Sequence, residues 1–284
     1  MQRIAAPFAV LALFLVLAAC SDPVASGGSL LPALPAGVDP TVDHLDCLVE
    51  DVTFDGDVTI PEGVECVFEF RNVTVEGNVA VAPNASLVMI GGFVDGNVHV
   101  YRFASVDLSG TFVEGNVQGE RSAAVVVRDG AEVDGDVQVE RGQGAVRVLF
   151  SDVLGNVQVD ETVGPIEVVG AFVGGNVQLT QNLGDIVVGG STVGGDVQLD
   201  ENLGGIDVSD NTVDGNVQLE RNHGSIFVGD NWVGGDVQLE ENLGGFDVFD
   251  NVIDGNLQCS DNAMPIDGLG NVVGGDKEGQ CWAF

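Results

Sequence analysis

Three histidines are the side chains of this sequence best suited to proton transfer or zinc binding. His44, His99 and His223 lie far apart, and none has neighbours at the spacing that a zinc site or a catalytic triad requires. His223 stands where other repeats carry Leu203 and Leu243, so we expect it to be a partly buried turn histidine. The sequence therefore predicts no catalytic residue, no metal site and no cofactor.

Acidic side chains dominate the charged residues. The chain holds 44 acidic and 9 basic residues, a formal net charge of −35. This charge excludes attraction to nucleic acid or to anionic lipid head groups. Carboxylate pairs can cleave glycosidic bonds, but acids are so frequent here that a pair identifies no site. The sequence favours a protein that is not an enzyme; a polysaccharide-active enzyme is the alternative, which rests on fold analogy alone.

Five cysteines divide into one single residue, Cys20, and two pairs. Cys47 and Cys66 lie near the start of a repeat region, and Cys259 and Cys281 lie near its end. Because each interval is about one repeat, the partners of a pair would lie on adjacent coils roughly 5 Å apart, within reach of a disulfide. We expect two disulfides that staple the ends, formed in an oxidising compartment.

The N-terminal segment has the features of an export signal. A basic residue precedes an apolar run over residues 4–17, which is too short to span a membrane and suits a signal peptide over residues 1–19. The segment Leu17–Cys20 resembles the lipobox of bacterial lipoproteins, whose cysteine is acylated. The alternative is an ordinary signal peptide that leaves Cys20 as a plain thiol. Residues 20–44 then form a flexible tether, and the expected partner is the membrane, through the acyl anchor.

Twelve glycines mark the repeat that must position all the remaining polar side chains. Their spacing is twenty residues from Gly115 onward. A fixed period in this range is typical of stacked units, each of which buries its apolar face only against its neighbours. The marks are Gly56, Gly77, Gly96, Gly115, Gly135, Gly155, Gly175, Gly195, Gly215, Gly235, Gly255 and Gly275.

One repeat reads as short strands joined by turns. Val213 to Glu220 alternates apolar and polar residues, which predicts a strand with one dry and one wet face. Turn signals follow at 222–224 and 230–231, and Gly215 is expected to allow a bend through unusual dihedrals. Two or three strands per twenty residues describe an all-β, single-stranded parallel β-helix, or solenoid, over residues 45–284. We expect about 11–12 coils, wound right-handedly as parallel crossovers generally are.

Stacking turns each repeat position into a column along the axis. Glutamines recur at one outward position, where their amides can bond to one another and tie the coils together; we prefer this structural ladder to a binding role. From Asn176 to Asp276, aspartate and asparagine alternate after the landmark glycine, which spaces the carboxylates. We expect diffuse counter-ions there rather than tight calcium binding. The glutamines are Gln118, Gln138, Gln158, Gln178, Gln198, Gln218, Gln238 and Gln258, and a corner column of asparagines is Asn182, Asn202, Asn222, Asn242 and Asn262.

Three aromatic residues interrupt the polar exterior. Phe227 and Phe249 are expected to point outward on successive coils, with Trp232 at the adjacent turn. Isolated exposed apolar residues are common, but these three lie close along one side. We expect them to contact a partner, either a glycan through ring stacking or another surface protein.

The two ends of the stack differ from its middle. Lys277 takes the column of Val217 and Val237, where a buried ammonium group is costly, so the core should stop there. Residues at each end are expected to fold over it and hide the unpaired strand edge. They are Cys281, Trp282 and Phe284 at one end, and Phe54, Phe68 and Phe70 at the other.

Gly-Asn-Val-Gln coils, as at Gly215 to Gln218, resemble those of uncharacterised exported bacterial β-solenoid lipoproteins. They resemble more distantly the repeats of bactofilins, which polymerise, and those of pectate-lyase-type β-helices. The resemblance covers the solenoid alone and implies a fold without an activity. We expect a non-catalytic lipoprotein of the cell surface or periplasm with a structural or adhesive role. The alternative is a carbohydrate-binding or carbohydrate-active β-helix protein.

Overall fold

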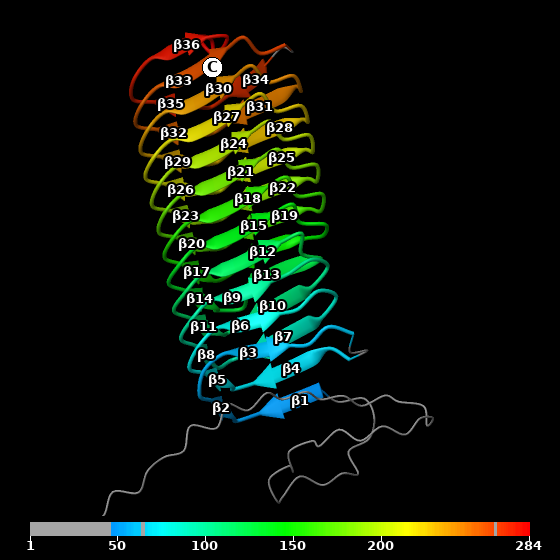
Figure 1. The fold of residues 1–284 in the computed structure, drawn as a ribbon. Helices are drawn as coiled ribbons and strands as arrows, with labels where there is room; N and C mark the ends of the chain where they lie inside the picture. Colours follow the sequence, from blue (N-terminus) through cyan, green and yellow to red (C-terminus); the bar gives the residue numbers. More distant parts are fainter. Residues whose placement is uncertain (1–46, 64–65, 264–265) are drawn as a thin grey trace, which may run out of the picture.

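The protein is a rod of stacked coils. The computed structural model describes residues 47–63, 66–263 and 266–284, and within these ranges the chain forms 36 strands and no helix. Each coil gives one strand to each of three parallel sheets, which have 12 strands apiece (Figure 1). The predicted all-β parallel solenoid is confirmed. The expected signal peptide, Cys20, the tether and His44 lie outside the described residues.

The three sheets are named A, B and C in the order in which a coil enters them. Sheet A consists of β1 (Cys47–Glu50), β4 (Phe68–Arg71), β7 (Ser86–Ile90), β10 (Ser105–Ser109), β13 (Ala124–Arg128), β16 (Val146–Leu149), β19 (Ile166–Val169), β22 (Ile186–Gly189), β25 (Ile206–Ser209), β28 (Ile226–Gly229), β31 (Phe246–Phe249) and β34 (Ile266–Leu269). Sheet B consists of β2 (Thr53–Phe54), β5 (Thr74–Val75), β8 (Phe93–Val94), β11 (Phe112–Val113), β14 (Glu132–Val133), β17 (Asp152–Val153), β20 (Phe172–Val173), β23 (Thr192–Val193), β26 (Thr212–Val213), β29 (Trp232–Val233), β32 (Val252–Ile253) and β35 (Val272–Val273). Sheet C consists of β3 (Val58–Ile60), β6 (Val79–Val81), β9 (Val98–Val100), β12 (Val117–Glu120), β15 (Val137–Glu140), β18 (Val157–Asp160), β21 (Val177–Thr180), β24 (Val197–Asp200), β27 (Val217–Glu220), β30 (Val237–Glu240), β33 (Leu257–Ser260) and β36 (Lys277–Gly279).

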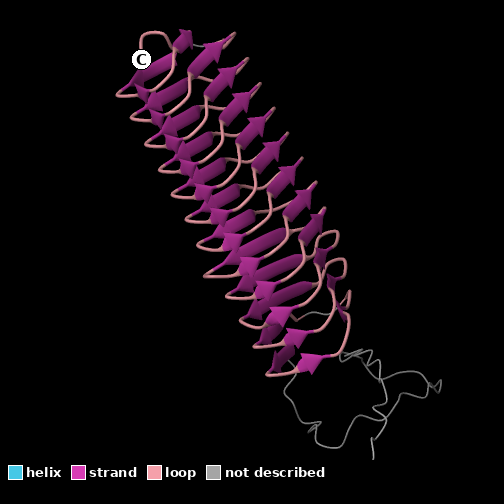
Figure 2. Cartoon of the chain, turned by 90° about the vertical axis from the view of Figure 1, so that its left-hand side faces the viewer, coloured by secondary structure: helices cyan, strands magenta, loops and turns pink. Residues whose placement is uncertain are grey.

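The coils stack in strict register, so the rod is regular along its length (Figure 2). In sheet C, Val197 pairs with Val217, and Val217 pairs with Val237. With strands about 4.8 Å apart, eleven intervals make the rod roughly 50 Å long. No part of the described chain forms an apolar helix long enough to cross a membrane.

Alternation within each strand separates the core from the surface. In β27, Val217 and Leu219 are fully buried, whereas Gln218 between them is half-buried on the outer side. Sheets A and B contribute Val208 and Val213 to the same interior. The core is therefore a set of valine, leucine and isoleucine columns, and its burial supplies most of the driving force for stacking.

Gly215 shows why the landmark glycine is needed. The chain bends at residues 214–215 between β26 and β27, as expected. Gly215 is not among the residues with positive φ; that conformation falls on Arg221 and Asp230 instead. A Cβ atom at Gly215 would lie 2.7 Å from the carbonyl oxygen of Gly195 on the preceding coil. The expectation of unusual dihedrals was therefore wrong, because the glycine is required by the close approach of two backbones.

The C-terminal end is closed by the last residues of the chain. Lys277 pairs with Leu257 in sheet C, and its ammonium group donates to the carbonyl oxygens of Asn271, at 3.0 Å, and Phe284. The ring of Phe284 lies over Gly268. Trp282 is 75% exposed, so the expectation that it folds over the end was wrong; Cys281 and Phe284 turn inward, as expected.

The aromatic residues near the other end lie inside the rod. Phe68 and Phe70 are buried in the second coil, and Phe54 of the first coil stacks on Phe70 with ring centroids 6.0 Å apart. Phe68 and Phe70 are therefore core residues and not an end cover, because the first coil already lies beneath them. This corrects the expected role of the two phenylalanines.

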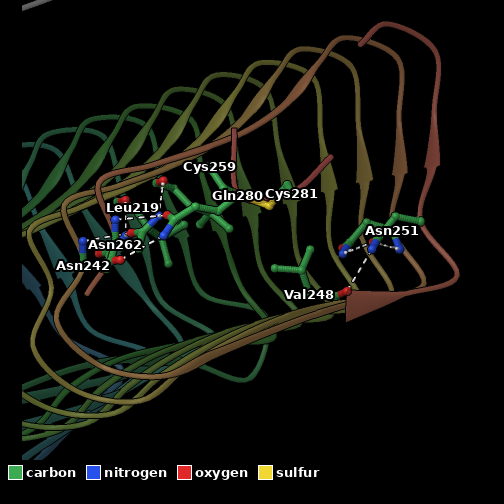
Figure 3. The surroundings of a disulfide bond; sticks show 10 residues. Leu219, Asn242, Val248, Asn251, Cys259, Asn262, Gln280 and Cys281 are labelled. Atoms are coloured by element: carbon green, nitrogen blue, oxygen red, sulfur yellow. Dashed lines mark hydrogen bonds between the residues drawn. A yellow bond between two sulfur atoms is a disulfide. The ribbon is translucent and has the colours of Figure 1, made fainter. Parts of the chain in front are cut away.

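The two predicted disulfides are present, one near each end. Cys47 and Cys66 have Cα atoms 6.1 Å apart, and Cys259 and Cys281 have Cα atoms 5.3 Å apart. The second disulfide ties β33 to the C-terminal segment (Figure 3). Each therefore joins chain segments about one coil apart.

Candidate functional site

The two described histidines lie on different parts of the surface. His99 is on the outer face of β9, with its ring 6.4 Å from that of Tyr101. His223 is exposed at the corner between sheets C and A, so its expected partial burial was wrong. Its column points outward, as shown by Leu203 and Leu243, which are 48% and 51% exposed. Among the described residues, no group of three or more His, Cys, Asp or Glu side chains could hold a metal ion.

The structure places the predicted glutamine column on the outer face of sheet C. From Gln118 to Gln218, each side-chain amide donates from Nε2 to Oε1 of the glutamine on the next coil, over 2.8 to 3.1 Å. The expectation that Gln258 belongs to this ladder was wrong, because its Nε2 donates to Oε2 of Glu278, at 3.4 Å. An amide has two N–H groups and two oxygen lone pairs, so each glutamine keeps hydrogen-bonding capacity that the ladder does not use. The residues joined in this way are Gln118, Gln138, Gln158, Gln178, Gln198, Gln218 and Gln238.

The corner column of asparagines lies inside the rod. Asn242 donates from Nδ2 to the carbonyl oxygen of Leu219, at 2.9 Å, and to Oδ1 of Asn262, at 3.1 Å (Figure 3). The column ends at Gln280, whose Oε1 accepts bonds from the backbone N–H and the side chain of Asn262. The side chains therefore satisfy backbone groups that the turn leaves without strand partners.

A second buried asparagine column lies between sheets A and B. Asn231 is 1% exposed and donates to the carbonyl oxygen of Val208, at 2.8 Å, and to Oδ1 of Asn251, at 2.9 Å. Sequence reasoning treated residues 230–231 only as a turn. The available signal was that asparagine recurs at this turn every twenty residues. An exposed turn accepts several residue types and does not require the same one in every coil. The members are Asn211, Asn231, Asn251 and Asn271.

The alternating aspartates and asparagines form a third column. Oδ1 of Asp196 accepts the backbone N–H of Asn216, at 2.7 Å, and Oδ1 of Asn216 accepts that of Asp236, at 2.8 Å. Aspartate and asparagine share this oxygen, so either residue fills the position. The column therefore joins neighbouring coils as well as spacing charge.

In the first half of the rod, however, acids stack directly at the position before the landmark glycine. Glu114 lies between Asp95 and Asp134 on consecutive coils. Its pKa is raised, chiefly by a hydrogen bond shared with the carboxyl of Asp95, then by desolvation and by repulsion from both neighbours. Charge spacing is thus a property of the later coils and not of the whole stack.

A shallow trough follows the outer face of sheet C. It consists of two adjoining hollows of about 430 Å³ each. They share Gln158 and Asp160, so the trough is continuous from His99 to Glu220. One side is the glutamine column. The other is formed by the last residues of the same strands, namely Glu120, Glu140, Asp160, Thr180, Asp200 and Glu220.

Asp160 lies where the two hollows meet. Desolvation by the neighbouring coils raises the pKa of its carboxyl, and repulsion from Glu161 adds to this, while a hydrogen bond from Thr180 acts in the opposite direction. Ion pairs hold other acids of this side: Arg221 lies 2.7 Å from Asp200. Asp160 takes part in none of the ion pairs between described residues.

The three aromatic residues expected to contact a partner lie on two sheets. Phe227 and Phe249 are both half-buried on sheet A, and the Phe227 ring covers Gly229, which pairs with Phe249. Trp232 is on sheet B, 41% exposed, in line with Val252. The structure therefore brings the phenylalanines together and places the tryptophan beyond the next corner.

Sequence reasoning overlooked a second exposed apolar column, at the corner between sheets C and A. Its side chains are 46 to 51% exposed. The signal was the recurrence of an apolar residue directly after the buried corner residue, which is Thr162 before Val163 and asparagine before the three leucines. The members are Val163, Leu183, Leu203 and Leu243.

Comparison of the chain with models of known protein families, with curated protein sequences and with solved structures finds no match.

Proposed function

We propose that this protein is a non-catalytic rod of the cell envelope that holds a surface at a fixed distance from a membrane. The observation that carries the proposal is the continuity of its side-chain columns. Two asparagine columns, the Asp/Asn column and the glutamine ladder join successive coils in addition to the backbone bonds. Such a stack resists bending and local opening, because each coil is held at several places around its circumference.

Attachment at one end supports the same role. Cys20 is the proposed acylation site, and residues 20–44 are the proposed tether between the lipid and the first coil. Two disulfides fit an exported protein that folds in an oxidising compartment. The high negative charge, −35 in all, keeps the rod hydrated and away from anionic head groups.

The height of the rod above a membrane tests this proposal. The acylated chain is bound to a supported bilayer, and neutron reflectometry measures the thickness of the protein layer. Deletion of residues 177–216 removes two coils. It leaves Asp236 as the next member of the Asp/Asn column after Asn176, so the alternation is kept. The layer should become thinner by about 10 Å, and Cys20→Ser should abolish attachment. An unchanged thickness on deletion would show that the rod lies flat and would contradict the spacer role.

Glycan binding is the second candidate, and the trough on sheet C favours it. The trough is long, open and lined by amides and carboxyl groups, with Tyr101 at one end. Polar side chains and an aromatic ring on an elongated face suit a polysaccharide chain better than a small ligand. Release of reducing ends from any polysaccharide would support a carbohydrate-active enzyme instead.

A further inference from the structure

The trough on sheet C has an axial period, and that period restricts what could occupy it. Each coil contributes one amide to one side of the trough and one end-of-strand residue to the other. Along each side, these groups recur about every 4.8 Å, the spacing of neighbouring strands. An extended peptide places side chains of one face about 7 Å apart, so it does not match this spacing. In an extended β-1,4-linked sugar chain each sugar is turned over relative to the one before it, so like groups on one side recur at every second sugar. That repeat is close to the rise of two coils, and the chain therefore stays in step with the trough.

The charge of the trough restricts the ligand further. Five of the six residues along its acidic side are carboxylates, interrupted only by Thr180. Arg141 and Arg221 form ion pairs with Glu140, Asp200 and Glu220 from the flank of this side. Glu120 and Asp160 take no part in the ion pairs between described residues. A polyuronate or another anionic chain would be repelled, whereas a chain bearing amino groups would meet complementary charge.

The remaining groups of the trough suit sugar rings. Glutamine amides keep N–H groups and lone pairs that can bond to hydroxyl groups. At one end, Tyr101 is 44% exposed and its ring stacks with that of His99. Aromatic faces of this kind combine apolar contact with a polar edge. The end of the trough therefore offers a surface on which a sugar ring can lie.

We propose that the trough on sheet C binds an extended β-1,4-linked glycan with free amino groups, every second one of which faces the acidic column from Glu120 to Glu220. This inference rests on the glycan-binding candidate and names its ligand class. Asp160 is central, because it lies where the hollows join and has no guanidinium partner among the described residues. A cationic amino group there restores favourable surroundings for an ionised carboxylate that has lost part of its water.

Calorimetric titration of the full exported chain carrying Cys20→Ser tests the proposal. The probes are β-1,4-linked glucosamine oligomers long enough to span the trough, the same oligomers N-acetylated, cello-oligosaccharides, oligogalacturonates and polylysine. Glucosamine oligomers should bind more tightly than all the others, and added salt should weaken this binding. Asp160→Asn should weaken it by about tenfold, the worth of one charge-assisted hydrogen bond.

Glu241→Gln is the matched control, because it removes one exposed acid outside the trough. It should change the affinity much less than Asp160→Asn, and both variants should keep the melting temperature of the parent. Equal binding of N-acetylated or neutral oligomers would overturn the amino-glycan class but leave glycan binding in place. Equal or tighter binding of polylysine, or equal effects of the two variants, would show that the acidic rod attracts cations in general and that the trough is not a specific glycan site. Failure of all glycans would overturn this inference and the glycan-binding candidate, but not the rod.

Discussion

The side chain of Asn222 lies inside the rod and donates to the carbonyl oxygen of Leu199, 2.8 Å away on the preceding coil. The same nitrogen also bonds to Oδ1 of Asn242. The polar groups at this corner between sheets C and A are therefore hydrogen-bonded to one another inside the rod and not to water.

Replacing Asn222 by alanine should destabilise the protein by about 1–3 kcal/mol, since it leaves buried backbone groups without partners. Urea denaturation gives the change in the free energy of unfolding. His223→Ala, one residue along and exposed, should change it by no more than about 0.5 kcal/mol. Similar effects of the two substitutions would contradict a structural role for the column.

Two glycine substitutions separate backbone contact from mere flexibility. Gly215→Ala places a Cβ atom 2.7 Å from the carbonyl oxygen of Gly195 and should cost about 1–3 kcal/mol. Gly245→Ala meets no atom within 4 Å and requires no positive φ, so it should be neutral or stabilising, by up to about 1 kcal/mol. Thermal unfolding of both variants measures the contrast. A mild effect at position 215 would show that neighbouring coils can move apart.

Glu114 predicts a pH dependence of definite sign. Its pKa is raised above the ordinary value of 4.5, so between 4.5 and the raised pKa the folded protein holds a proton that the unfolded chain releases. Stability should therefore decrease as pH rises through the raised pKa. Glu114→Gln should increase the melting temperature relative to the parent at neutral pH, and less so below pH 4.5. An increase that is the same at both pH values would argue against coupling to Asp95 and Asp134.

Asp57 predicts the opposite dependence. Its pKa is lowered by the backbone N–H of Asn78 and then by the side-chain amide of the same residue. The stability that this carboxylate adds should be present above its ordinary pKa of 3.8 and be lost as pH falls through the lowered value. Asp57→Ala should therefore destabilise the first coil at neutral pH but hardly at all in strong acid. Hydrogen exchange of Asn78 at the two pH values provides the measurement.

The disulfide near the C-terminus should protect the last coil in particular. Replacing Cys259 and Cys281 together by serine should cost about 3 kcal/mol for a loop of this length. Because each coil contacts only its neighbours, amide exchange should accelerate in β34 to β36 and remain slow in the middle strands. Uniform acceleration along the rod would show that the stack opens as one unit.

The twenty-residue period predicted the fold, because the structure inferred for one repeat applies to every other repeat in the stack. Gln218 could be assigned to an outer column from alternation alone, and the cysteine pairs from their interval. Asn231 could not be recognised as buried, since asparagine next to aspartate is equally typical of an exposed turn. Gly215 was interpreted through its own dihedrals, whereas its cause lies in the carbonyl group of Gly195 on another coil. The trough was missed for the same reason: it exists only between coils, where side chains twenty residues apart become neighbours.

Gln280 completes the corner asparagine column at the C-terminal end of this rod. Its side chain occupies the place that the asparagine of a further coil would take, and it also donates to the carbonyl oxygen of Asn262, at 2.9 Å. A second molecule that approached this end would find the acceptor for that column already supplied. The N–H donors of Asn262 are therefore already used within the chain, and this column offers none of them to a molecule stacked on this end.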